Sequence, residues 1–276
     1  MKTFSTVIAF AGASLSLMVS LKAAVVAYDF ETQTEGDVFD GGVTGWSQDT
    51  DNPEAFGVVF PIGYISTINF SGSGSGTNTG FLGTYVGNTP DNASTTVTGD
   101  LSGVGAIAAG DSSVTLNLGV IDDSTDQFTT RDEFSVVVRN DSSGEVARID
   151  LAPDAVDETL WNVSIGVNGA PSVGTPYSLE EGSGYQISIQ FEGGQTRFLH
   201  RSSEGGGTFI GLGNLAPVTS GDFGDIQMVH DPQGLAGSSA NALVFDNIVA
   251  VPEPSSSSLL LLGLAGALGW RRRSKQ

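Results

Sequence analysis

YQISIQFEGGQTRFLH, residues 185–200, decides the fold of this chain. From Tyr185 to Phe191 every second residue is apolar, and Gln186, Ser188 and Gln190 stand between them. A period of two is typical of a β-strand with one buried face and one wet face. The following Glu-Gly-Gly, residues 192–194, is a turn signal and joins this run to a second strand-like run. The stretch therefore predicts a β-hairpin.

The same alternation recurs through the body of the chain, at residues 114–120, 134–138 and 162–167. A second turn signal, residues 140–144, joins EFSVVVR to EVARIDL. No stretch of the body has a convincing apolar period of 3.6 residues. Many short strands with Gly-rich turns predict an all-β fold, an antiparallel two-sheet jelly-roll sandwich over residues 25–251.

Strand-like segments also lie at both ends of the body, AVVAYDFET from Ala24 and NALVFDNIVAV up to Val251. The YDFE and VFDNI elements resemble those of concanavalin-type and laminin-G-type jelly rolls and of carbohydrate-binding modules. In those domains the first and last strands often pair within one sheet. The resemblance implies that the two ends of this body pair as well.

Charge is distributed very unevenly along the 276 residues. Residues 28–251 carry 30 of the 31 acids against five arginines and no lysine, a formal charge of −25. Nucleic acid is therefore not expected as a partner, because it requires a basic surface. The chain has no cysteine, which excludes disulfides, a thiol nucleophile and thiolate metal sites.

Residues 1–24 are interpreted as a secretory signal peptide. Lys2 provides a positive start, an apolar stretch follows from about Val7 to Val19, and small residues precede the body. This segment implies signal peptidase as a partner, and we expect residues 1–24 to be helical. The body would then be exported.

Residues 252–276 form a separate C-terminal segment. Pro252 and Pro254 interrupt regular structure, and the run from Leu259 to Trp270 is apolar. Twelve residues of helix are at or below the length that spans a bilayer, which suits a transient transmembrane anchor. Three arginines would stay on the cytoplasmic side: Arg271, Arg272 and Arg273.

This tail resembles the PEP-CTERM sorting signal of Gram-negative bacteria, which the membrane enzyme exosortase recognises. The resemblance rests on Val251-Pro252-Glu253-Pro254, the short apolar helix and the arginine cluster, in that order. It implies that Pro252, Glu253 and Pro254 are the recognition motif. It also implies transient anchoring in the inner membrane, followed by release to the cell surface or to an extracellular, biofilm-type matrix.

A structural Ca²⁺ is one cofactor that the two terminal strands could hold. If Tyr28 and Phe30 face inward, Asp29 and Glu31 share the other face, and Asp246 lies on the closing strand. Ca²⁺ prefers hard oxygen ligands of this kind. The alternative is that these acids are simply solvated.

Catalytic patterns are weak. The two histidines, His200 and His230, are far apart, lack an H-E-x-x-H motif and are expected at the surface or in turns. No G-x-S-x-G nucleophile elbow and no E-x-D-x-E strand is present. The nearest carboxylate pairs, Glu180 with Glu181 and Asp222 with Asp225, fit turns equally well. We expect no enzymatic activity.

Sugar binding needs exposed aromatic rings flanked by polar side chains. Trp46, in the loop-like GVTGWSQDTDNPE, is the best candidate for such a ligand platform, with burial as the alternative. The leading hypothesis is a non-catalytic protein of the cell surface or matrix, and extracellular polysaccharide is a further partner to be tested. A lectin-like carbohydrate-binding module is the alternative, and a jelly-roll glycoside hydrolase comes third.

Overall fold

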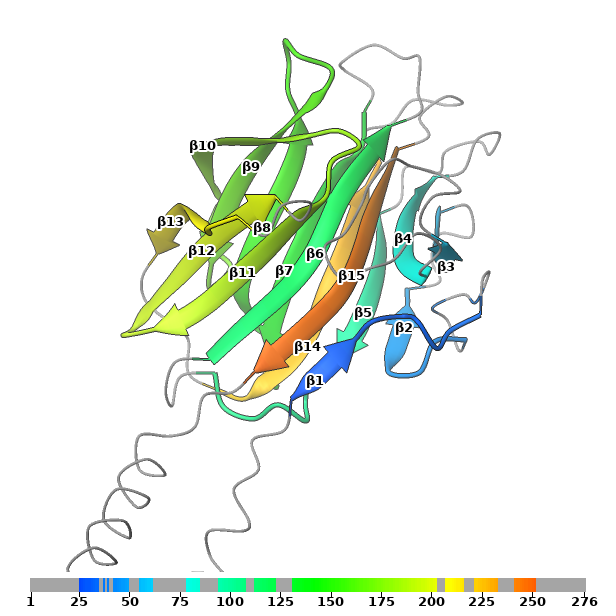
Figure 1. Cartoon of the computed structure of the whole chain (residues 1–276). Coiled ribbons are helices and arrows are strands. Elements are labelled where there is room, and N and C mark those ends of the chain that lie inside the picture. The colour runs from blue at the N-terminus through cyan, green and yellow to red at the C-terminus, as the bar shows by residue number, and fades with distance from the viewer. Residues whose placement is uncertain are drawn as a thin grey trace, which may run out of the picture.

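The computed structural model describes residues 25–34, 37, 39, 42–49, 55–61, 78–84, 94–107, 112–122, 131–202, 207–215, 221–232 and 241–251. Within these ranges the secondary structure consists of strands and turns, arranged in two antiparallel sheets that pack face to face (Figure 1). The predicted all-β sandwich is confirmed. The expected signal helix and C-terminal helix lie outside the described residues, and none of the described residues forms a helix able to cross a membrane.

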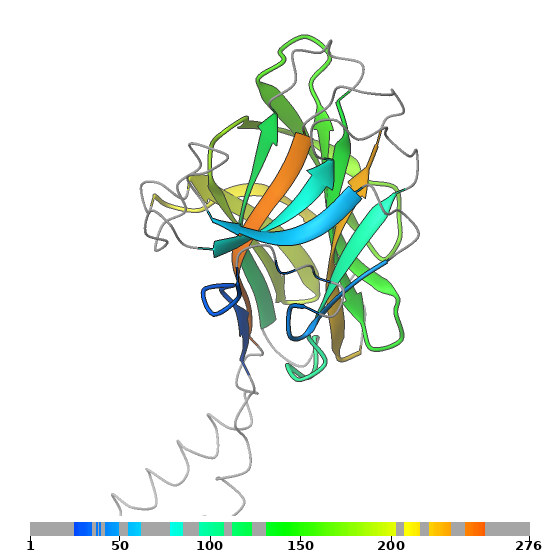
Figure 2. The same ribbon diagram turned by 90° about the vertical axis from the view of Figure 1, so that its right-hand side faces the viewer.

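The first sheet has the strand order β13-β12-β11-β6-β15-β4-β3, with β1 paired to β15 beside that path. Its strands are β1 (Val26–Tyr28), β3 (Ala55–Pro61), β4 (Asn78–Thr84), β6 (Ser112–Asp122), β11 (Tyr185–Glu192), β12 (Gln195–Ser202), β13 (Ile210–Leu215) and β15 (Asn241–Val251). The second sheet has the order β10-β9-β8-β7-β14-β5-β2. Its strands are β2 (Trp46–Gln48), β5 (Thr95–Asp100), β7 (Glu133–Asn140), β8 (Glu145–Pro153), β9 (Leu160–Val167), β10 (Val173–Glu180) and β14 (Phe223–Asp231). Figure 2 faces the edge at which β3 and β2 end the two sheets.

The hairpin predicted at residues 185–200 is present as β11 and β12. Glu192 pairs with Gln195, so the loop consists of Gly193 and Gly194 alone. Both glycines have positive φ, 58° and 78°, which a tight turn between twisted strands requires. Ile187, Ile189 and Phe191 are buried, as the alternation predicts.

The first and last strands pair, as the resemblance implied. Val26 lies opposite Ala250 and Tyr28 opposite Ile248 in an antiparallel ladder. Between its pairing with β4 and its pairing with β1, β15 carries a bulge after Asp246, where Asn247 has a φ of 49°. The body is thereby closed by its own two ends, because β1 extends the ladder of the final strand (Figure 1).

Both histidines are buried, contrary to the expectation of surface or turn positions. His200 is 8% exposed and His230 is 0% exposed. Each takes an inward position on its strand, β12 or β14, where the alternation of the neighbouring apolar residues places it in the interior. The expectation was wrong because it was based on the polar character of histidine. The position of each histidine in the apolar alternation is what decides its burial.

His200 makes the stability of the fold sensitive to acid. Burial lowers the pKa of its imidazole, and neither ring nitrogen finds a hydrogen-bond partner among the described residues. The unfolded chain therefore binds this proton more readily than the folded chain, so stability is present above the ordinary histidine pKa, near 6.5, and is lost as pH falls through it. Tyr177 packs against the ring, with 5.0 Å between ring centroids.

We expect His200→Phe to flatten the pH dependence of unfolding between about pH 7.5 and pH 5. Phenylalanine keeps an aromatic ring beside Tyr177 and cannot be protonated. Urea unfolding followed by far-ultraviolet circular dichroism at several pH values measures this. An unchanged slope in the variant would contradict it.

Candidate functional site

The residues of the predicted sorting motif, Pro252, Glu253 and Pro254, and the cluster Arg271, Arg272 and Arg273 lie outside the described residues. What the structure does show is where the body ends. β15 continues to Val251, which is paired with Ser113 of β6. The motif therefore follows the last strand directly, with no intervening residue.

The predicted Ca²⁺ ligands differ in how far their side chains are buried. Asp29 and Glu31 are exposed, and Asp29 accepts a 3.3 Å hydrogen bond from the backbone N–H of Glu31. Asp246 is fully buried and accepts a 3.0 Å hydrogen bond from the Asn247 amide. Across the ranges that the structure describes, no three acidic, histidine or cysteine side chains are grouped closely enough to hold a metal. The three predicted ligands are thus not brought together there.

Trp46 is a core residue, and the prediction of an exposed ligand platform is wrong. Its side chain is 6% exposed. It packs against Tyr28, Phe30, Phe39 and Phe245, with ring centroids 5.0 to 5.6 Å away. We call these five residues the aromatic cluster.

The reason for this burial is the pairing of Trp46 with Gly99 of β5. A Cβ atom on Gly99 would lie 2.8 Å from Cζ2 of Trp46, so the indole occupies the space that a side chain there would fill. The same loop sequence is compatible with an exposed or a buried indole. Only the partner strand decides between them.

A set of mostly half-buried polar residues lies on the outer face of the second sheet. In β14 the residues Ile226, Met228 and His230 are buried, whereas Asp225 and Gln227, on either side of Ile226, are partly exposed. The same alternation in the neighbouring strands builds a surface that we call the polar face. Its members are Thr98 and Asp100 of β5, Ser135 and Arg139 of β7, Arg148 and Asp150 of β8, and Asp225 and Gln227 of β14.

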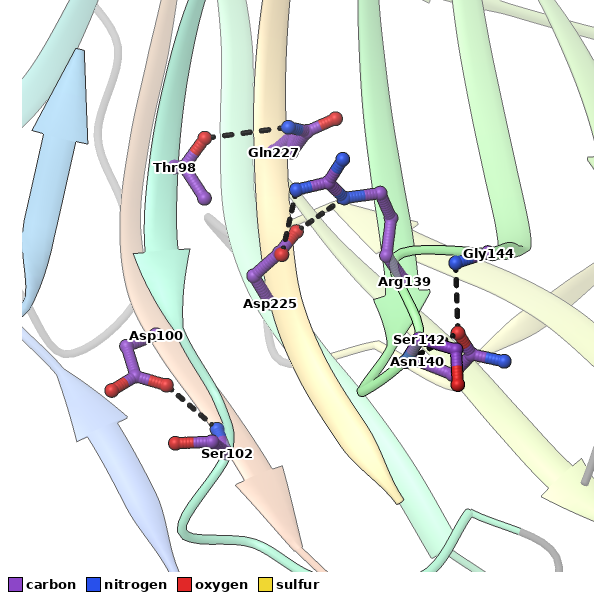
Figure 3. Close-up of polar contacts among 9 residues, drawn as sticks. All are labelled: Thr98, Asp100, Ser102, Arg139, Asn140, Ser142, Gly144, Asp225 and Gln227. Carbon is purple, nitrogen blue, oxygen red and sulfur yellow. Dashed lines mark hydrogen bonds and ion pairs between the residues drawn. The ribbon is translucent and has the colours of Figure 1, made fainter. Parts of the chain in front are cut away.

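An ion pair stands at the centre of the polar face (Figure 3). Asp225 is paired across the ladder with Arg139, whose Nε and Nη2 each donate a 2.7 Å hydrogen bond to one carboxylate oxygen. These hydrogen bonds raise the pKa of Arg139. Bidentate geometry fixes both side chains, since two parallel bonds leave little rotational freedom. The pair therefore holds this carboxylate in one orientation.

The other acids of the polar face also have fixed hydrogen bonds. Asp100 Oδ1 accepts a 2.8 Å hydrogen bond from the backbone N–H of Ser102 (Figure 3). Asp150 accepts hydrogen bonds from the hydroxyls of Ser135, at 2.6 Å, and Ser172. The polar face is therefore a preorganised array of donors and acceptors.

A hollow opens beside this array, between β2 and β14. Its volume is about 360 Å³, and it is lined by Gly45, Trp46, Ser47, Thr98, Asp100, Gly224 and Asp225. Residues from three strands that are distant in the sequence meet here, because β2 pairs with β5 and β5 pairs with β14. Trp46 reaches the hollow only as part of its wall.

A second pair of carboxylates lies at the far end of the second sheet. Glu133 of β7 stands directly opposite Asp231 of β14. Burial, the charge of Asp231 and then that of Asp150 raise the pKa of Glu133. Asp231 accepts a 3.1 Å hydrogen bond from the Ser94 hydroxyl.

The sequence had singled out Asp225 beside Asp222 as a carboxylate pair, but the register places Asp225 opposite Asp100 instead.

One family description matches the chain, the PEP-CTERM protein-sorting motif at residues 250–273. The chain therefore carries this motif, as the resemblance of its tail indicated, and the motif implies an exported protein that exosortase processes. No protein of curated function matches the chain.

Solved structures show that the body shares a known fold. The catalytic domain of a GH131 β-glucanase from Podospora anserina is 13% identical, with a TM-score of 0.50 over 82% of this chain and 94% of that one. The carbohydrate recognition domain of Emp47p is 9% identical, with a TM-score of 0.46 over 83% and 95% of the two chains. The exoplasmic domain of VIP36 in a Ca²⁺-bound form is 9% identical, with a TM-score of 0.46 over 80% and 89%. Of these three, the glucanase domain reaches a TM-score of 0.50, and at 13% identity the likeness concerns the fold alone.

Proposed function

We propose that this chain is an exported, non-catalytic β-sandwich that works on the cell surface or in the extracellular matrix and binds neutral polysaccharide through its polar face. The observation that carries the proposal is the preorganised set of hydrogen-bonding groups on that face, centred on the Arg139–Asp225 pair. Fixed donors and acceptors suit sugar hydroxyls, because their geometry is set before the ligand arrives.

The negative charge of the body favours neutral polysaccharides over anionic ones. Residues 28–251 carry a formal charge of −25. This net charge would repel an anionic polysaccharide, whereas it would not repel a neutral one. The two arginines of the polar face are engaged with acids, Arg139 with Asp225 and Arg148 with Glu145 and Asp150. They leave little positive potential for an anionic chain.

The absence of catalysis is part of the proposal. A glycosidase needs one carboxyl that is protonated at working pH and a second that is ionised. Asp225 faces Asp100, but both of its carboxylate oxygens already accept hydrogen bonds from Arg139. This pair is better suited to binding than to proton transfer.

A glycoside hydrolase is the second candidate, and Glu133 favours it. Its pKa is raised and it stands opposite Asp231, which is the relation that a general acid and an ionised partner require. The two candidates predict different results with the same substrate.

The test uses the protein in its exported form, produced with its sorting enzyme and recovered from the cell exterior. It is incubated with insoluble neutral glucans and mannans, with and without a Ca²⁺ chelator, and assayed for co-sedimentation and for new reducing ends. We expect co-sedimentation without new reducing ends, and weaker co-sedimentation with anionic polymers. New reducing ends that Glu133→Gln abolishes would establish the hydrolase instead. No co-sedimentation with any polymer would contradict polysaccharide binding.

A further inference from the structure

We infer that the hollow beside β2 is a subsite for one or two rings of a neutral saccharide with adjacent hydroxyls, and that Asp100 is its principal acceptor. This inference rests on the proposed function and names the place on the molecule where a sugar unit sits. A volume of about 360 Å³ lies at the lower end of the range for small-molecule sites.

The register of three strands builds a two-row array around the hollow. Ser47, Thr98 and Gln227 are consecutive cross-strand partners and form one row. Asp100 and Asp225 form the next row, with Arg139 beyond them. Neighbouring strands are about 4.8 Å apart, so each row offers a polar group at about the width of a sugar ring.

The two rows offer complementary hydrogen-bonding capacity. Thr98 Oγ1 accepts a 3.4 Å hydrogen bond from the Gln227 amide, which leaves its own proton to donate (Figure 3). Asp100 receives the Ser102 N–H on Oδ1, and a carboxylate has further acceptor positions on both oxygens. Two adjacent sugar hydroxyls can donate to one carboxylate, whereas an anionic sugar would meet Asp100 and Asp225 as like charges.

The rim of the hollow is held in place by residues around it. Gly45 and Gly224 line the hollow with backbone, because a Cβ there would lie 2.9 Å from the Tyr28 hydroxyl oxygen or 2.3 Å from the Asn140 carbonyl oxygen, respectively. The Tyr28 hydroxyl donates to the backbone carbonyl of Asp100 at 2.5 Å and lies 3.5 Å from that of Gly45. Since Tyr28 belongs to β1, the pairing of the first and last strands also holds this rim in place.

The test titrates the protein with neutral disaccharides and measures their binding by isothermal titration calorimetry. Asp100→Asn keeps the shape of the side chain and an oxygen for the Ser102 N–H, but it removes the charge. We expect it to weaken disaccharide binding at least tenfold. The matched control is Asp157→Asn, because Asp157 accepts the backbone N–H of Thr159 at 3.0 Å in the same local geometry, on a distant loop. The control should bind within twofold of the unaltered chain.

The outcomes separate the subsite from the proposed function. If the unaltered chain binds both disaccharide and polymer and Asp100→Asn loses only the disaccharide, the subsite is supported. If Asp100→Asn binds the polymer and the disaccharide as tightly as the unaltered chain does, the subsite is wrong and the polysaccharide-binding function stands. If the unaltered chain binds neither, both are overturned. Equal melting temperatures of the variants establish that folding is intact, and a disaccharide of uronic acids should not bind.

Discussion

Replacing Trp46 with alanine is expected to lower the free energy of unfolding by about 3–5 kcal/mol, the range for removing a large buried aromatic ring. The indole contacts four other rings, those of Tyr28, Phe30, Phe39 and Phe245. Its Nε1 has no hydrogen-bond partner in the described part of the chain, so the loss comes from packing. Urea unfolding followed by far-ultraviolet circular dichroism measures the change.

Trp46→Phe is the matched variant for this prediction. It keeps an aromatic ring over Gly99 and should lose less than half as much stability as Trp46→Ala. A loss below about 1 kcal/mol in the alanine variant would contradict the assignment of Trp46 to the core. The aromatic cluster ties β2 to β1 and β15, so loss of sugar binding in Trp46→Ala would report unfolding rather than a missing platform.

Asp132→Ala is expected to cost about 1–3 kcal/mol, the range for leaving a buried polar group without its hydrogen-bond partner. Asp132 Oδ2 lies 2.7 Å from Nε2 of His230, and the two side chains are 3% and 0% exposed. Without the carboxylate, the imidazole stays buried beside the Phe134 ring and loses this hydrogen bond. The measurement is again the free energy of unfolding in urea.

The double variant Asp132→Ala with His230→Phe tests the reason for that cost. Removing both polar groups relieves the unpaired imidazole, so the double variant should be more stable than Asp132→Ala alone. The control is Arg197→Ala, which breaks an exposed pair with Glu192 at 2.9 Å and should cost less than about 1 kcal/mol. A double variant less stable than the single one would contradict the explanation.

The sequence predicted the fold through local signals. The alternation in residues 185–191 and the glycines at 193 and 194 gave the β11–β12 hairpin, and each signal lies within a few residues of the element that it specifies. The sorting tail could also be predicted from the sequence, because its parts stand in order along the chain. The pairing of the two terminal strands came from resemblance and was confirmed.

The candidate site was predicted poorly, because its residues come from separate strands. Asp100 and Asp225 are 125 positions apart and meet only through the β5–β14 register. Each stands next to a glycine in a strand-like run, which is a weak signal without a known partner strand. Both histidines were misplaced, and burial and exposure of Trp46 were both left open, for a related reason: a polar or loop-like neighbourhood says little about which face of a strand is covered.

By itself, therefore, the sequence determined that the body is built of alternating strands, that it is strongly acidic and that it carries a sorting motif at residues 250–273. These properties depend on composition or on neighbours along the chain. Only the tertiary structure decided that Arg139 holds Asp225, that a hollow forms beside β2 and that Trp46 faces the core over Gly99. The physical reason is that a period of two assigns side chains to opposite faces of a strand, while the order and register of the strands decide which side chains meet.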